Sequence, residues 1–161
     1  MDKIISLSAF GDVREPGLNK KEIVSGFPKK SESTGHSIIF SKILQNMSQA
    51  KLLHWQSLRY GQHKALDELF EGIIDHGDNL AESIMGKYGR PVLSEKDLCL
   101  NLHNYKNPET EDLYEFVDHL YKFYSEQAKS FFSPDKDPEI INILDEIISL
   151  IDKSQYLLTL K

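Results

Sequence analysis

Residues 54–82 read HWQSLRYGQHKALDELFEGIIDHGDNLAE, and this stretch decides the fold. From residue 62 to residue 88, apolar side chains recur at steps of three and four residues. This spacing predicts one long amphipathic α-helix, because residues at these steps lie on the same face of a helix. The apolar positions are Leu66, Leu69, Phe70, Ile73, Ile74, Leu80, Ala81, Ile84 and Met85.

The same helix carries two polar pairs four residues apart, His63 with Asp67 and Asp78 with Glu82. At about 100° per residue, the four side chains fall within an arc of about 100°, at the edge of the apolar face. An imidazole together with three carboxylates suits iron or manganese. Any single charged pair is by default part of a solvated helix face, so the hypothesis of a metal site rests on the whole pattern.

Distance limits how these pairs can bind a metal. Asp67 and Asp78 are eleven residues apart, which is roughly 16 Å along a helix. Ligands lie within about 2.0–2.6 Å of a bound ion, so the two pairs cannot share one ion within a chain. His63 and Glu82 are centred between residues 72 and 73, and so are Asp67 and Asp78. Two copies of the helix crossing about a two-fold axis there would bring His63 to the partner's Glu82, and Asp67 to the partner's Asp78.

The run of His54-Trp55, then His-x3-Asp, then Asp-x3-Glu resembles the signature of the Dps miniferritins. The fifteen residues from His63 to Asp78 match the interval in that family, whereas the nine from His54 to His63 are fewer than is usual there. The resemblance implies that His54 and His63 bind metal from one subunit and Asp78 and Glu82 from its two-fold mate. Asp67 would be an additional ligand.

By the same resemblance, the protein is expected to be a ferroxidase. It would oxidise Fe(II) with peroxide or dioxygen at these five catalytic and metal-binding residues, and store iron (Fe2+/Fe3+) as ferric mineral. Manganese is an alternative metal. The implied assembly is a homodimer through the second helix and a homododecamer overall. The sequence HWQSLRYGQHKAL also resembles uncharacterised ferritin-like proteins of phages and large viruses.

Two other functions stay open at this point. One is a non-enzymatic, viral or cellular, helical interaction protein whose acidic stripe binds a structural metal or a partner. The other is a metal-binding dimer that never forms a cage. A conventional ferritin centre within one subunit is disfavoured, since no Asp or Glu occurs from His36 to Gln56 and the last helix has no histidine.

The expected fold is all-α: a ferritin-like antiparallel four-helix bundle over residues 36–161, preceded by an extended tail at 1–35. The helices are predicted at about 37–56, 62–88, 109–132 and from Pro138 onward, with Ser33, Thr34 or Ser37 capping the first and Asp137 the fourth.

A long crossover at 90–108, with a short helix from Ser94 to Leu102, would join the second helix to the third. Glu115 and His119 form a further pair, interpreted as a surface or hydrogen-bonded pair. The inward face of the first helix is predicted to comprise Phe40, Ile43, Leu44, Met47, Ala50 and His54.

The composition of the chain limits which binding partners and which cellular compartment are expected. The chain has 161 residues and a net charge of −6, with Cys99 as its one cysteine. The tail is close to neutral, so DNA binding is expected to be weak or absent. There is no apolar run of 18 residues and no apolar signal-peptide core, which predicts a protein without membrane contact. The expected location is the cytoplasm, which would be that of a host, or a virion, if the protein is viral.

Overall fold

The computed structural model describes residues 35–104 and 111–160. In this part of the chain every regular element is helical, and no helix there combines the length and apolar character needed to cross a membrane. The elements are α1 (Ser37–Gln56), α2 (Tyr60–Tyr88), α3 (Glu111–Lys122), a π-helical turn η2 (Phe123–Ala128), a 3-10 turn η3 (Lys129–Phe131) and α4 (Pro138–Thr159). An all-α chain with four main helices is thereby confirmed. The predicted tail lies, apart from Gly35, outside the described residues.

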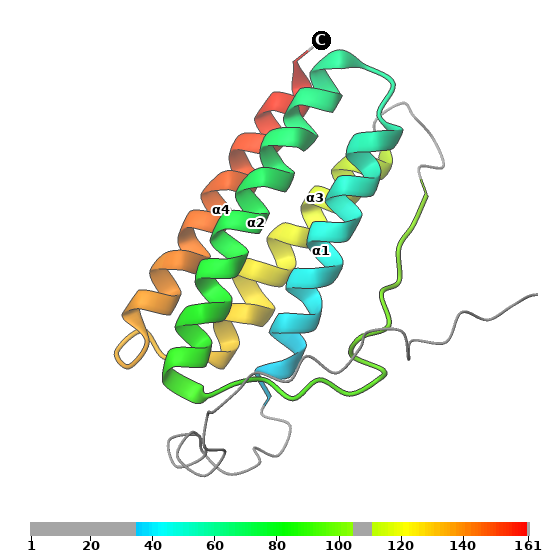
Figure 1. Ribbon diagram of the computed structural model, residues 1–161. Coiled ribbons are helices and arrows are strands. Elements are labelled where there is room, and N and C mark those ends of the chain that lie inside the picture. Colours follow the sequence, from blue (N-terminus) through cyan, green and yellow to red (C-terminus); the bar gives the residue numbers. More distant parts are fainter. Residues whose placement is uncertain (1–34, 105–110, 161) are drawn as a thin grey trace, which may run out of the picture.

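The four helices pack side by side, and neighbours run in opposite directions (Figure 1). α2 packs against both α1 and α4, while α3 packs against α4. α1 and α3 face each other across a cleft that both helices line. Going around the bundle, the order is therefore α1, α2, α4 and α3, and the second helix is joined to the third by a connection that runs back along the length of the bundle.

The helical spacing in the sequence correctly predicted which face of α2 is buried. Leu66, Leu69, Leu80 and Ile84 are fully buried against the other helices. Ile74, at the edge of the stripe, is 36% exposed, so it marks the boundary between core and surface.

On α1 the predicted inward face is rotated slightly from the observed one. Leu44, predicted to face inward, is 42% exposed, whereas Ile39 and Leu53 are buried without having been predicted. The same inward face carries two buried amides, Asn46 and Gln49. Polar residues at core positions shift the apparent apolar stripe, which explains the error.

The crossover contains no helix in its described part, so the short helix predicted from Ser94 to Leu102 is wrong. Ser94 and Asp97 instead close a turn, in which the Ser94 N–H and Oγ donate to Asp97 Oδ2 at 2.9 and 2.7 Å. Such side-chain bonds to the backbone compete with helix formation. The leucines at 98, 100 and 102 are 39–56% exposed, so no buried face stabilises a helix.

Amide and hydroxyl side chains of α1 hold the crossover against the bundle. Ser41 Oγ donates to Asp97 O at 2.6 Å. Further along, Gln49 Nε2 donates to His103 O at 2.9 Å, and the His103 N–H donates back to Gln49 Oε1 at 2.7 Å. These bonds align the connection parallel to α1 and make one wall of the cleft.

Two predicted helix caps differ from those in the structure. The N-cap of α1 is His36, so Ser37 is its first helical residue instead of its cap, while Ser33 and Thr34 lie outside the described residues. Asp137 does occupy the N-cap position of α4, with Pro138 following it, but its carboxylate makes no capping bond to α4. That buried carboxylate instead accepts from Tyr88 Oη at 2.6 Å and pairs with Lys87 Nζ at 2.7 Å.

The predicted third helix at 109–132 is interrupted within its last three turns. After Lys122 the backbone widens into the π-helical turn η2. Two consecutive aromatic residues of this turn, Phe123 and Tyr124, are both buried, with ring centroids 4.9 Å apart in an edge-to-face arrangement.

Candidate metal centre

The two candidate histidine ligands meet where α1 turns into α2. His54 lies in the last turn of α1 and is buried, and His63 lies in the first turn of α2 and is half-buried. Their ring centroids are 4.0 Å apart with the planes inclined by 31°. The short turn at residues 57–59 thus brings the pair together.

Hydrogen bonds define the orientation of both rings. His54 Nδ1 donates to the backbone oxygen of His63 at 3.2 Å, and His63 Nδ1 donates to the backbone oxygen of His54 at the same distance. Ser57 Oγ donates to His54 O at 2.7 Å and lies 3.2 Å from His63 Nδ1. A carbonyl oxygen can only accept, so each ring carries its proton on Nδ1. In the neutral rings Nε2 therefore keeps the lone pair that a metal requires.

Asp67 is the third group at this end of the bundle. Its Oδ1 lies 3.6 Å from His54 Nδ1, and its Oδ2 lies 3.5 Å from Lys64 Nζ. The side chain is 28% exposed, so it can be approached from solvent. Carboxylates that touch a histidine in this way commonly orient the ring in metal sites.

The structure does not bring Asp78 and Glu82 to this cluster. Both are exposed and lie further along α2, more than two turns beyond Asp67. Among the residues described, no group of three or more His, Cys, Asp or Glu side chains could hold a metal ion within a single chain.

Next to Asp78, a groove separates α1 from α2. It has a volume of about 330 Å³ and is lined mainly by apolar side chains, including Leu44, Met47 and Ile74, with Asp75 and Asp78 at its edge. Gly77 also lines the groove, and an added Cβ there would come within 3.1 Å of Ile43 Cγ2. The glycine thus permits the close approach of the two helices.

Trp55 follows His54 at the end of α1. Its side chain is 69% exposed, so it does not pack in the core. Leu58 and Tyr60, in the same turn, are 76% and 80% exposed. This end of the bundle therefore presents apolar surface around the two histidines.

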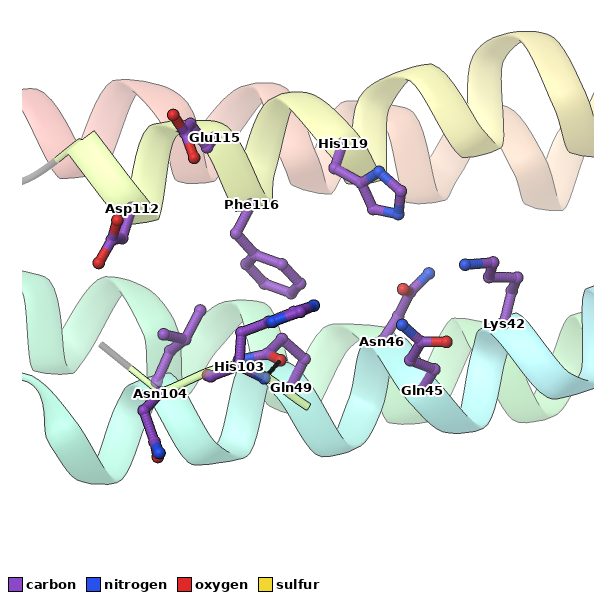
Figure 2. A pocket seen from close by; sticks show the side chains of 11 residues that line it. Lys42, Gln45, Asn46, Gln49, His103, Asn104, Asp112, Glu115, Phe116 and His119 are labelled. Atoms are coloured by element: carbon purple, nitrogen blue, oxygen red, sulfur yellow. Dashed lines mark hydrogen bonds between the residues drawn. The ribbon is translucent and has the colours of Figure 1, made fainter. Parts of the chain in front are cut away.

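A second site, which sequence reasoning missed, is the cleft between α1 and α3 (Figure 2). It has a volume of about 510 Å³, and its lining includes Lys42, Asn46, Glu115, Phe116 and His119. Glu115 and His119, interpreted from the sequence as a surface pair, both border it. The available signal was the run of polar residues on the inward side of α1, which is unusual for a bundle core.

Burial and charge shift the pKa of one residue that lines this cleft and of one residue behind it. Burial lowers the pKa of His119, and the nearby Lys42 ammonium lowers it further. Deeper in the bundle, burial raises the pKa of Tyr124 to about 12. The Tyr124 hydroxyl accepts a hydrogen bond from Asn46 Nδ2 at 3.4 Å.

No curated protein and no solved structure matches this chain. The profile of a family described as "Family of unknown function (DUF5856)" matches residues 54–158. The match begins at His54 and includes His63, Asp67, Asp78 and Glu82. It covers well over half of the chain, and the protein therefore belongs to the family of unknown function DUF5856.

Proposed function

We propose that this protein is a Dps-like iron-binding protein that oxidises Fe(II) at two equivalent sites, each shared between two subunits. His54 and His63 supply imidazole nitrogens from one subunit, with Asp67 beside them. The partner's Asp78 and Glu82 supply carboxylates. The observation that carries the proposal is the contact of His54, His63 and Asp67 at one end of α2, on the helix that exposes Asp78 and Glu82 further along.

The donor set is appropriate for this chemistry. Neutral imidazoles with free Nε2 atoms bind Fe(II), and carboxylates provide the hard oxygen ligands that Fe(III) prefers. Each Fe(II) gives up one electron to a peroxide or dioxygen supplied from solution, and the reduced oxidant takes up protons to form water. Iron is here the substrate, and the ferric product is retained as mineral if the protein assembles into a shell.

Two features of the fold support a ferritin-like arrangement. Neighbouring helices are antiparallel, and a long connection along α1 joins α2 to α3 (Figure 1). Ferritin-like bundles share this use of one long crossover. The apolar groove between α1 and α2 offers a surface for a second subunit next to Asp78.

The direct test is anaerobic titration of the full chain with Fe(II), followed by addition of peroxide or dioxygen and measurement of native mass. The proposal expects one tight Fe(II) per subunit, faster oxidation than in buffer, and a mass of at least a dimer. Glu139→Gln, a carboxylate change on α4, is the control and should leave all three results unchanged. A monomer that binds no Fe(II) at micromolar concentration would refute the proposal.

A further inference from the structure

The cleft between α1 and α3 has the character of a ligand site and is separate from the proposed iron centre. Two of its lining side chains, Asn46 and Gln49, are 2% and 7% exposed. Buried amides in a helical bundle are costly unless their hydrogen bonds are satisfied. Both atoms of the Gln49 amide bond to His103, so this residue serves the fold.

Asn46 has no comparable structural explanation. Its one described hydrogen bond is the long contact from Nδ2 to Tyr124 Oη at 3.4 Å. Tyr124 reaches this position from the π-helical turn η2, and such turns are frequent at functional sites. The Tyr124 hydroxyl thus lies beside the Asn46 amide, behind the wall of the cleft that Asn46 lines.

Charge is distributed along the cleft from a basic end to an acidic end. Lys42 and His119 lie together at one end, and Asp112 lies at the other, as Figure 2 shows. Within the described residues Lys42 forms no ion pair. Its ammonium is therefore available to a bound anion.

Two carboxylates of α3 form the acidic end of the cleft. Glu115 precedes His119 by four residues and Asp112 precedes it by seven, which is roughly 6 Å and 10 Å along the helix. Between the two ends, the ring of Phe116 projects into the cleft and offers an apolar surface (Figure 2). A small ligand lying along the cleft thus meets a cation, an amide, an aromatic ring and then carboxylates.

From this arrangement we propose that the cleft binds a small zwitterion whose carboxylate and cationic group lie at opposite ends of a short chain, as in arginine, lysine and ω-amino acids. The carboxylate sits between Lys42 and His119 and accepts from the Asn46 or Gln45 amide. The aliphatic chain passes over Phe116, and the cationic group faces Glu115. A phosphate or another multiply charged anion fits less well, because the acidic end repels it.

The experiment is calorimetric titration of the full-length chain at neutral pH with L-arginine and 6-aminohexanoate. Hexanoate and hexylamine, which each lack one of the two charges, are the matched probes, and inorganic phosphate tests for a simple anion site. We expect saturable binding of at least one zwitterion, and at least tenfold weaker binding of hexanoate, hexylamine and phosphate. Equal binding of hexanoate or phosphate, or no saturable binding of either zwitterion, overturns the proposal.

Variants assign the binding to the cleft. Lys42→Gln and Glu115→Gln should each weaken binding of the zwitterion at least tenfold. Lys122→Gln removes a cation that also lies near His119 but pairs with Asp118 and does not line the cleft, so it should bind like the unmodified chain. In that unmodified chain, ligand should shift the NMR signals of the Asn46 side-chain amide and the His119 ring. Binding without these shifts places the ligand elsewhere and contradicts the proposal.

Discussion

The imidazoles of His54 and His63 each donate from Nδ1 to the backbone carbonyl of the other residue, at 3.2 Å in both directions. This reciprocal arrangement links the last turn of α1 to the first turn of α2. It also fixes both neutral rings in the same tautomer, with Nε2 as the metal-binding atom.

The first prediction concerns this tautomer. In long-range ¹H–¹⁵N NMR spectra at a pH where both rings are neutral, His54 and His63 should each show the Nδ1–H form. Addition of Zn(II), as a diamagnetic substitute for Fe(II), should shift the Nε2 signals while Nδ1 keeps its proton. Spectra showing the Nε2–H form for either residue would contradict this assignment.

The second prediction tests whether the site is shared. His63→Ala and Glu82→Ala should each abolish tight Fe(II) binding when tested alone. Mixed under conditions of subunit exchange, the two variants should regain part of it, because a heterodimer retains one site with both residues intact. Exchange is verified by native mass spectrometry. If exchange is shown and the dimer stays soluble and folded, but binding is still absent, the shared-site model is wrong.

The third prediction concerns two glycines near the end of α2. Gly89 has a φ of 86°, so Gly89→Ala should lower the free energy of unfolding by about 1 kcal/mol or more. Gly86 is helical, and an added Cβ would have no heavy atom within 4 Å, so Gly86→Ala should raise it by up to about 1 kcal/mol. Urea denaturation measures both values. A Gly89→Ala variant that is as stable as the unmodified chain would contradict the prediction for Gly89, and a destabilised Gly86→Ala variant would contradict the prediction for Gly86.

The fourth prediction concerns the pH dependence of stability. The Lys87 ammonium, the Tyr88 hydroxyl and the Ser133 N–H hold the pKa of Asp137 at about 2, compared with about 3.9 in an unfolded chain. Since the folded-state pKa is the lower one, the stabilisation is complete above pH 4 and is lost as the pH falls toward 2.

Urea denaturation across this range should therefore show that the unmodified chain is more stable than Asp137→Asn at pH 7, and that the difference shrinks below pH 4. Asp135→Asn, which changes an exposed carboxylate two residues away, should show no such convergence. A difference between the Asp137→Asn and unmodified chains that stays constant from pH 7 to pH 2 would exclude this carboxylate as the source.

Local periodicity was sufficient to predict most of the helical structure. The stripe from Leu66 to Ile84 and the boundaries of α1 follow from spacing within a few turns, because side chains three and four residues apart must share a helix face. The separation of Asp67 from Asp78 along α2 is equally local. For this reason the sequence alone excluded a single-chain site containing both pairs.

The tertiary structure decided the features that depend on distant residues. Only the packing of α1 against the crossover explains why Gln49 is buried, and only the π-helical turn places Tyr124 beside Asn46. The contact of His54 with His63 depends on the path of the turn between the helices, which spacing does not specify. The cleft between α1 and α3 exists because segments more than fifty residues apart converge. A hydrophobic pattern indicates which face of one helix is buried, but it does not indicate which helix packs against that face.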